Sequence, residues 1–346
     1  MDVTVGTFNL NNLFDRFNFS ADLGALPAEE RDVRTTYLWE FVGQGGGAGP
    51  IVDPASSSTP IVRVQRNADG RLLSGKSITQ QKAIAGRIDA MDLDVLAVQE
   101  VENRDVLREF NRTCLSNPYP HEVVIEGNDP RFIDVGLLSR FPVANITSHR
   151  FEQHPDRSEP VFGRDLLQVD VFNRTRRRRL FTLFINHLKS KFVPFFVADK
   201  EAAQAENTLL RTQQAETVAR VVDAQTRPNS RYIVLGDMND VPEADALRAL
   251  RDDGLGLTDA LDAVVESQPP PRATNPEDVP PSARWTSRLS VPRAADRFEL
   301  LDQIWLSPSL APKLAHAEIE RRPFFSASAA GVGSDHDPVW IRLSGV

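Results

Sequence analysis

The chain has almost no cysteine, no long hydrophobic run and no excess of positive charge. Cys114 is the only cysteine among 346 residues, which excludes an internal disulfide and a cysteine-based zinc site. No apolar stretch approaches the roughly 20 residues that a membrane helix needs. The N-terminus lacks a basic region followed by an apolar one, so the sequence shows no export signal. We expect a cytoplasmic protein by default, and a secreted one if a leader has been removed.

The net charge limits the ways in which the protein can bind nucleic acid. Lys and Arg total 40 against 48 Asp and Glu, so the formal net charge is −8. This excess of acid argues against a protein that coats nucleic acid through its bulk charge, but it leaves room for a local basic groove. Hydrophobic residues make up 41% of the chain, which is enough for a substantial core.

Three stretches are typical of surface excursions. Residues 20–76 contain GQGGGAGP and DPASSSTP, and residues 266–298 are rich in proline. The arginine run 176–179 is predicted to be the solvated tip of a hairpin. None of these stretches links two self-sufficient cores, and the chain has no internal repeat. We therefore predict a single domain over residues 1–346, with insertions at about 20–76 and 266–298. We expect a monomer without a stable protein partner.

A recurring unit dominates the rest of the chain: a short apolar, β-branched run that ends abruptly in polar residues. Runs this short and this hydrophobic suit strands buried within a layered core. The eight runs are residues 3–12, 93–103, 134–141, 166–172, 179–191, 231–240, 300–308 and 338–343. Amphipathic helices are predicted between some of them, at residues 77–91, 199–224 and 242–250. The combination predicts an α/β fold.

Polar side chains gather at the ends of these runs. They are Asn9, Asn11, Glu100, His187, Asp237, Asn239, Asp302, Asp335 and His336. Each has an ordinary explanation when taken alone, because a turn, a helix cap or a buried hydrogen bond can use the same residue types. Together they supply carboxylates, imidazoles and amides at chain breaks in strands that share a sheet. Oxygen ligands of this kind suit Mg²⁺, which keeps open positions for water and a phosphate.

Six motifs in a fixed order carry a family resemblance. They are TFNLNN, VQEVEN, INHLKSK, GDMND, LLDQIW and SDHDPV. The set resembles the endonuclease/exonuclease/phosphatase superfamily, the group of DNase I, exonuclease III and the inositol polyphosphate 5-phosphatases, over about residues 3–343. QEVEN and NHLKSK are most similar to a bacterial DNase I-like branch with secreted nucleases and the membrane nuclease of mycoplasmas. The resemblance implies a four-layered α/β sandwich, in which two mixed β-sheets pack face to face with helices outside.

The resemblance also implies a metal site and a base for cleaving phosphodiesters. Glu100 and Asp335 would hold Mg²⁺, for which Mn²⁺ can substitute, with Asn11 nearby at a position where relatives often carry Asp. Asp237 would take the proton from the attacking water, and Asn239 would orient that water or bind a second cation.

Histidines and neighbouring cations complete the implied site. His187 and His336 would donate to the phosphoryl oxygens or protonate the leaving group, and Asp302 would hold the His336 imidazole in one tautomer. Asp337 has no family role and is predicted to be a turn residue.

Substrate contacts are also implied around this centre. Asn9 would hydrogen-bond the phosphate region, and Arg131 is predicted to contact a phosphate. Lys189 and Lys191 lie beyond His187, where they would meet backbone phosphates or remain solvated.

The motifs leave three functions open. One is a Mg²⁺-dependent nuclease that takes DNA or RNA as its partner. Another is a phosphatase or phospholipase-type hydrolase of the same fold, acting on inositol phosphates or sphingomyelin. Related inositol phosphatases usually have Asn-Tyr-Arg after Gly-Asp-x, whereas residues 239–241 are Asn-Asp-Val, which favours the nuclease, although sphingomyelinases lack that signature too. A non-catalytic binding protein would have lost some of the catalytic side chains, and all are present.

Overall fold

A computed structural model describes the chain in two compact units. The described residues are 1–14, 76–129, 131–193, 197–252, 254–266, 283–289, 297–321 and 333–346, with the backbone of two further strands. One unit comprises Met1–Leu13, Lys76–Lys191 and Glu201–Val346, and the other comprises Phe14–Gly75 and Phe192–Lys200. In the second unit the described strands β2 (Tyr37–Glu40) and β3 (Arg63–Arg66) pair antiparallel. Of the predicted insertion at 20–76, Lys76 is described in the first unit, and the residues other than these strands and Lys76 lie outside the described residues.

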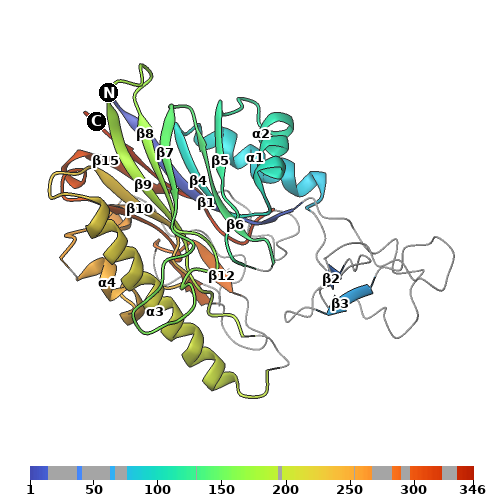
Figure 1. Ribbon diagram of the computed structural model, residues 1–346. Helices are drawn as coiled ribbons and strands as arrows, with labels where there is room; N and C mark the ends of the chain where they lie inside the picture. Colours follow the sequence, from blue (N-terminus) through green and yellow to red (C-terminus); the bar gives the residue numbers. More distant parts are fainter. Residues whose placement is uncertain are drawn as a thin grey trace. The chain divides into compact units, whose positions relative to one another are not determined.

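Two mixed six-stranded sheets form the first unit (Figure 1). The first has the order β15-β16-β1-β4-β6-β5, with β1 (Val3–Leu13), β4 (Val95–Val101), β5 (His121–Val124), β6 (Asp134–Ser139), β15 (Leu314–Ile319) and β16 (Val339–Leu343). The second has the order β11-β14-β10-β9-β8-β7, with β7 (Val143–Ser148), β8 (Leu167–Phe172), β9 (Arg179–His187), β10 (Tyr232–Asp237), β11 (Thr258–Asp259) and β14 (Asp302–Leu306). All eight predicted strands are present, and they are the eight interior strands of the two sheets.

Three apolar clusters separate four layers. Between the two sheets lie side chains such as Val5, Leu137 and Leu183. Phe8 and Leu96 face the other way and pack with α1 (Ile78–Met91) and α2 (Arg104–Cys114); Phe184 and Trp305 pack with α3 (Lys200–Gln225). Successive strand residues point to opposite faces, so each interior strand contributes to two clusters. Each fully buried apolar side chain contributes roughly 1.5–3 kcal/mol. The predicted four-layered α/β sandwich is confirmed.

Of the three predicted helices, those at 77–91 and 199–224 correspond to α1 and α3, the third is wrong in its start, and α2 was not predicted. At α1, Ser77 and Gln80 form a capping box, which fixes the start of this helix. The helix predicted from residue 242 is wrong in its start, because Val241–Ala244 form a turn and a short 3₁₀ segment at Asp245–Leu247 precedes α4 (Arg248–Arg251). Pro242 thus occupies the turn rather than the first turn of a helix.

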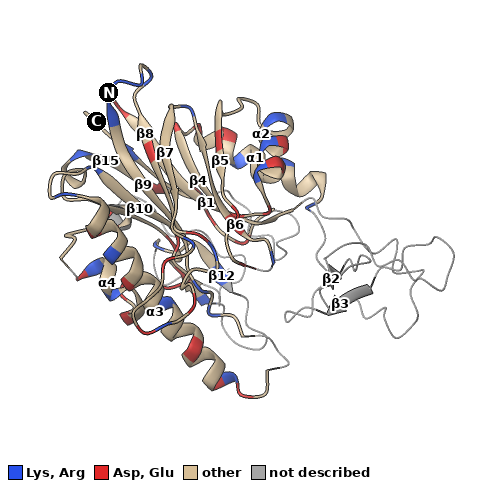
Figure 2. Cartoon of the chain, viewed as in Figure 1, with Lys and Arg blue, Asp and Glu red and all other residues tan. Residues whose placement is uncertain are grey.

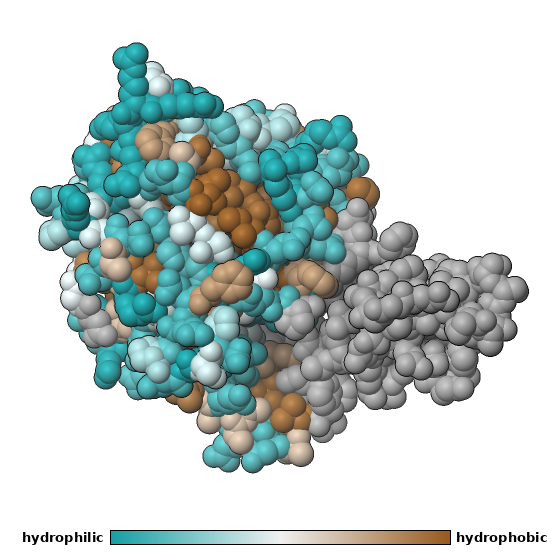
Figure 3. Space-filling model, in the orientation of Figure 1, coloured by the Kyte–Doolittle hydropathy of each residue, from teal (hydrophilic) through white to brown (hydrophobic). Residues whose placement is uncertain are grey.

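Part of the second insertion is ordered beside the sheets. β12 (Ser287–Leu289) and β13 (Arg297–Glu299) form a two-stranded antiparallel sheet, and His336 forms an isolated bridge with Ser287. The intervening residues 290–296 and all of residues 267–282 lie outside the described residues. In the described part of the chain, every helix is too short or too polar to cross a membrane. The face of the first unit seen in Figure 3 is mainly hydrophilic, with one larger apolar patch and smaller apolar areas elsewhere on it.

Candidate active site

The second sheet places three predicted site residues in a row. β9 and β10 are parallel neighbours, and their register sets His187 opposite Asp237. β14 runs antiparallel on the other side of β10 and sets Asp302 opposite Asp237. All three side chains are buried. Three of the strand-end residues picked out in the sequence therefore lie side by side at one end of the second sheet.

The first sheet reaches the same site through irregular backbone. β1 pairs with β4 as far as Asn9 and Gln99, and the register then shifts on both sides of β4. Eight described non-glycine residues have a positive φ, and five of them lie in the motifs of this site or next to Arg131: Asn11 (48°), Asn12 (60°), Glu100 (61°), Phe132 (54°) and Asn239 (52°). Left-handed backbone of this kind costs free energy and is typical of functional sites. At these positions the backbone departs from regular strand geometry, so the side chains of Glu100 and the asparagines no longer alternate between the two faces of the sheet.

Asn9 connects the two sheets at the site. Its Nδ2 donates to Asp237 Oδ2 at 3.0 Å, and its Oδ1 accepts from the backbone N–H of Asn11 at 2.9 Å. Its backbone carbonyl accepts from Ser334 Oγ at 2.7 Å, which fixes the loop that carries Asp335 and His336. The amide predicted to bind phosphate is thus engaged in positioning Asp237.

His336 is held as a cation. Its Nδ1 lies 2.6 Å from Asp302 Oδ2, and its Nε2 lies 4.0 Å from Asp237 Oδ2. Burial alone would lower the pKa of His336, but the carboxylates of Asp302 and Asp237 outweigh burial and hold that pKa well above its ordinary value. The imidazolium therefore persists beside Asp237.

His187 is held neutral. Burial, together with the positive charge of Arg164, lowers the pKa of His187 well below its ordinary value. Its Nε2 lies 3.5 Å from Asp237 Oδ2 and 4.0 Å from Glu100 Oε1. Its Nδ1 is buried and has no hydrogen-bond partner among the described residues. The two histidines thus flank Asp237 in different charge states.

The pKa of Asp237 lies near neutral pH. Burial raises the pKa of Asp237 to about 7, against the lowering effect of His336. Asn239 donates its backbone N–H to Asp237 Oδ1 at 2.9 Å, and its side-chain amide donates to the carbonyl of Leu188 at 3.0 Å. A carboxyl group with a pKa near 7 is suited to general-base work at neutral pH.

Glu100 and Asp335 form a separate pair of carboxylates. Burial and the nearby charge of Asp335 raise the pKa of Glu100, and both carboxylates interact with the ammonium group of Lys76. Asn11 Nδ2 donates to Asp335 Oδ1 at 2.7 Å, so in this arrangement Asn11 supports Asp335 instead of offering its own oxygen.

This pair fits a hard divalent cation. Two neighbouring carboxylates repel each other without a cation, and the exposed Asp335 leaves room for water ligands. The described residues contain no group of three or more His, Cys, Asp and Glu side chains that could hold a metal. Mg²⁺ is commonly bound through one or two carboxylates with water and substrate phosphate, so two ligands suffice for it.

A buried arginine that the sequence did not single out lies next to this centre. Arg164 Nε lies 3.1 Å from Asp129 Oδ2, and its NH1 donates to the carbonyl of Leu188 at 3.2 Å. Arg131 binds the same carboxylate through its Nε and NH2 groups, at 3.0 and 2.9 Å. Burial opposes ionisation, but the two arginines lower the pKa of Asp129 to about 2. The signal in the sequence was a charged pair, Arg164-Asp165, directly before a buried strand.

The two predicted lysines differ in their surroundings. Lys189 is fixed through its backbone, whose N–H donates to Gln214 Oε1 at 2.7 Å. Lys191 Nζ lies 2.9 Å from Asp240 Oδ1 and 2.7 Å from Glu299 Oε1. Lys191 is therefore held by carboxylates of its own protein.

The expectation that Asp337 is only a turn residue is wrong. Its carboxylate accepts from Arg87 NH2 at 2.7 Å and from Arg321 NH1 at 2.9 Å. Arg87 also donates to the carbonyl of His336 at 3.2 Å. Asp337 thus anchors the segment that presents His336. The arginines that reveal this role lie far away in the sequence, which is why the motif alone did not show it.

Solved structures similar to this chain share its fold. An endonuclease/exonuclease/phosphatase family protein from Bacteroides thetaiotaomicron matches with a TM-score of 0.53 and 16% identity, over 99% of this chain and 95% of that chain. TDP2 of D. rerio, humanized by 14 mutations, matches with a TM-score of 0.54 and 13% identity over 99% of each chain. A mannosyl-6-phosphatase from B. thetaiotaomicron matches with a TM-score of 0.51 and 15% identity over 98% of each chain.

The sequence itself matches one family. A comparison with curated protein sequences found no match. The profile of the endonuclease/exonuclease/phosphatase family, in contrast, matches residues 6–336. Enzymes of this family are phosphoesterase hydrolases and generally depend on a divalent metal. Since this match covers nearly the whole chain and the sandwich is shared with solved members, the protein belongs to the endonuclease/exonuclease/phosphatase family.

Proposed function

We propose that this protein is a divalent-cation-dependent phosphodiesterase, and within that class a Mg²⁺-dependent nuclease of the bacterial DNase I-like branch that cleaves DNA or RNA. One observation carries the proposal. The buried carboxylate of Asp237 lies between a neutral imidazole, His187, and a cationic imidazole, His336. Groups in different protonation states at one centre are what general acid–base hydrolysis needs.

Each side chain of this centre has a distinct task in hydrolysis. Asp237 takes a proton from the attacking water, while Asn9 and the Asn239 N–H hold its carboxylate in position. The oxygen of that water bonds to phosphorus, and the bond from phosphorus to the leaving oxygen breaks. His336 gives its proton to the leaving oxygen, and His187 donates a hydrogen bond to a phosphoryl oxygen. The products are a phosphate monoester and an alcohol.

Charge compensation comes from two sides of the centre. Glu100 and Asp335 would hold the divalent cation, which when bound offsets negative charge on the phosphoryl oxygens. Arg164 and Arg131 add positive charge near His187. Both are close enough to lower the pKa of His187. A preorganised set of cations stabilises the charge of a phosphoryl transition state.

Flanking residues favour a polynucleotide over a small ester. Arg131 is kept in one orientation by Asp129, and Lys189 lies two residues after His187. A polynucleotide presents several phosphates, so such flanking cations gain affinity by releasing counterions. Asp129 is shared by Arg131 and Arg164, so one positive charge of that group is left over. Lys191, in contrast, is not counted because two carboxylates, Asp240 and Glu299, hold its one charge. A phosphatase is the second candidate, favoured by the likeness to the mannosyl-6-phosphatase.

A substrate panel tests this proposal. With Mg²⁺ present, the protein should hydrolyse plasmid DNA, single-stranded DNA or RNA, and leave inositol phosphates, sphingomyelin and a mannosyl 6-phosphate at background. Asp237→Asn, assayed in parallel, should hydrolyse every substrate at least about 10²-fold more slowly, which excludes a contaminating nuclease as the source of the activity. Turnover of an inositol phosphate, sphingomyelin or the sugar phosphate, with polynucleotides left intact, would replace the nuclease by the phosphatase or phospholipase-type hydrolase.

A further inference from the structure

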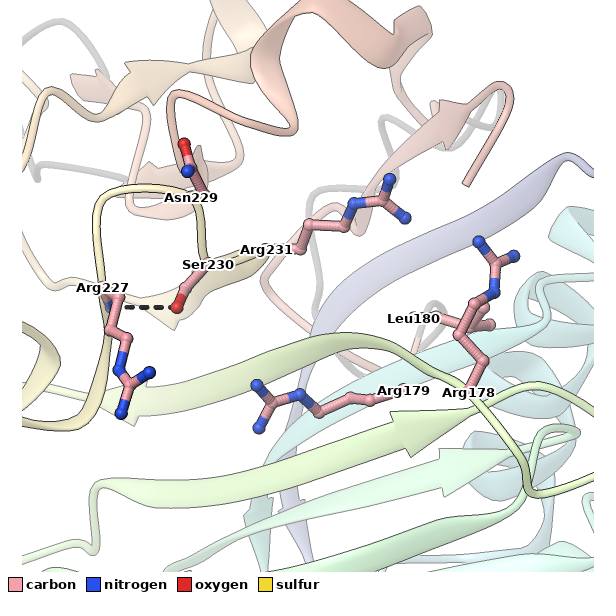
Figure 4. Close-up of a pocket in the computed structure, with 7 residues that line it drawn as sticks. All are labelled: Arg178, Arg179, Leu180, Arg227, Asn229, Ser230 and Arg231. Carbon is pink, nitrogen blue, oxygen red and sulfur yellow. Dashed lines mark hydrogen bonds between the residues drawn. The ribbon is translucent and has the colours of Figure 1, made fainter.

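A hollow lined by four arginines lies at the end of the second sheet opposite the candidate active site. Arg178, Arg179, Arg227 and Arg231 line it together with Asn229 and Ser230, and its volume is about 470 Å³ (Figure 4). We call these six residues the arginine pocket. Arg179 begins β9 and His187 ends it, so eight steps of roughly 3.3 Å place the pocket about 26 Å from the catalytic histidine. The catalytic centre therefore does not account for the pocket.

Two well-ordered turns supply the arginines. In the turn from β8 to β9, Asn173 Oδ1 accepts the backbone N–H groups of Arg177 at 3.0 Å and Arg178 at 3.2 Å. In the turn from α3 to β10, Ser230 Oγ accepts the backbone N–H of Arg227 at 2.9 Å, and the Ser230 N–H returns to the Arg227 carbonyl at 2.8 Å. A ligand that binds there meets a backbone that is already in place, which lowers the entropic cost of binding.

Positive charge exceeds negative charge in the arginine pocket. Arg179 is paired with Asp170 at 3.2 Å, and Arg178 donates to the backbone oxygen of Val346 at 2.8 Å. Arg227 and Arg231 have no ion-pair partner within the part of the chain that the structure describes. Figure 4 shows the side chain of Arg179 extending toward the side of the hollow where Arg227 lies, while Arg178 and Arg231 extend to another side of it. Figure 2 shows the concentration of basic residues at the β8–β9 turn.

Such a cluster is unexpected on an acidic protein. The formal net charge is −8, yet four arginines line one hollow. Guanidinium groups repel one another at short range, and an anion placed between them removes that repulsion. The planar fork of arginine matches the oxygens of a phosphate group in a bidentate arrangement, which lysine cannot reproduce.

We propose that the arginine pocket is a second anion site, which binds a compact ligand with two or more adjacent phosphate groups. A hollow of this size is within the roughly 300–1,000 Å³ range of small-molecule sites. The arginines come from two turns and line one hollow, whereas a polynucleotide requires cations spaced along a groove. The same chemistry is present in a free oligophosphate and in the headgroup of a bisphosphorylated lipid. The site does not depend on the proposed nuclease activity.

Calorimetric titration with tripolyphosphate tests the proposal on the full chain in excess EDTA. Arg227→Gln/Arg231→Gln should bind tripolyphosphate at least about ten-fold more weakly than the wild type, since two charge-assisted partners are lost. Arg227→Gln alone, at an exposed position, should lose part of that affinity and guards against a folding defect in the double variant. Arg248→Gln/Arg342→Gln removes the same charge from exposed positions outside the pocket and should bind like the wild type.

Two further arms distinguish the sources of phosphate. Flotation with phosphatidylcholine vesicles, with and without a phosphatidylinositol bisphosphate, identifies a lipid headgroup if only the latter capture the wild type. Binding of tripolyphosphate without vesicle capture identifies a free ligand, and both results support the pocket. The proposal is overturned if the wild type does not bind tripolyphosphate, if all variants bind it equally, or if the arginines are needed only for binding a polynucleotide.

Discussion

Asp302 decides the charge of the histidine that faces Asp237. It is completely buried and lies 2.6 Å from His336 Nδ1. Without its carboxylate, the His336 imidazole would lose the partner that raises its pKa most, and that pKa would fall. The acid of the reaction would then lose its proton at a lower pH.

Asp302→Asn should therefore shift the alkaline limb of the pH–rate profile to lower pH. The loss of kcat should be small on the acidic side and reach about 10²-fold on the alkaline side, the scale for a general acid. The profile of kcat against pH, compared with that of the wild type, measures the shift. An equal loss at every pH would mean that Asp302 only supports the fold.

Asp237 provides a second test at this scale. Its pKa is about 7 in the folded protein, against an ordinary 3.8, so the folded state binds more protons than the unfolded state between those values. The contribution of Asp237 to stability is thus largest at low pH and declines as pH rises to about 7. Activity should move the opposite way and rise through the same range as the base form appears.

Asp237→Asn should lower kcat by roughly 10²-fold or more, because it keeps the shape and removes the base. Its melting temperature relative to the wild type should improve from about pH 5 to about pH 8, as the buried charge is avoided. Thermal melts at both pH values, beside rate measurements, check this. Activity lost only through unfolding at all pH values would make Asp237 a core residue.

At the level of elements, one glycine sets the spacing of the catalytic strands. A Cβ built on Gly236 would lie 2.0 Å from the carbonyl oxygen of Asn186 on β9, and its φ is 134°. That approach brings His187 and Asp237 side by side. Only glycine fits a backbone contact this close.

Gly236→Ala should prevent folding or separate β9 from β10. Gly86, in the middle of α1, is the matched control, since nothing lies within 4 Å of its added Cβ. Gly86→Ala should raise stability by about 0.5–1 kcal/mol through its higher helix propensity. Chemical denaturation of both variants makes the comparison. A soluble, active Gly236→Ala variant would contradict the proposed strand spacing.

The strands also show which parts of the fold were predictable. The eight interior strands are apolar on both faces, and each was predicted from its continuous apolar run. The four strands of these two sheets that were missed, β5, β7, β11 and β15, are the edges of the sheets, and the two-stranded sheets β2–β3 and β12–β13 within the predicted insertions were also missed. The middle of β7, for example, is exposed to solvent, so no apolar run marks it. Burial on both faces leaves a pattern in the sequence, and an edge position does not.

The residues of the candidate site also divide into those that the sequence predicts and those that it does not. His187, Asp237 and Asp302 were predictable because each ends or begins a buried strand, and strands of one sheet bring their ends together. Asp129 and Arg164 come from loops that precede β6 and β8, and only the fold makes them neighbours. The spacing of motifs along the sequence cannot predict this ion pair, because the two loops come together only in the folded protein.

At the scale of the whole molecule, the charge next to the catalytic centre has the opposite sign to the net charge. The protein is acidic overall, yet Arg131 and Arg164 lie beside the catalytic centre. If the substrate is a polynucleotide, its KM should rise steeply with salt. Lys189→Gln should reduce the slope of log KM against log salt by roughly one phosphate contact. The exposed Lys82→Gln on α1 is the control and should leave the slope unchanged. Identical slopes for the two variants would remove Lys189 from the substrate path.

The cation dependence of hydrolysis tests the central claim most directly, because the account rests on Glu100 and Asp335 as a hard-cation pair beside Asp237. Excess EDTA should abolish cleavage of the preferred phosphodiester, and added Mg²⁺ or Mn²⁺ should restore it without any need for Zn²⁺. Glu100→Gln/Asp335→Asn should require far more Mg²⁺ for half-maximal rate, or remain inactive. Undiminished turnover in excess EDTA, or an unchanged Mg²⁺ requirement in the double variant, would contradict the account.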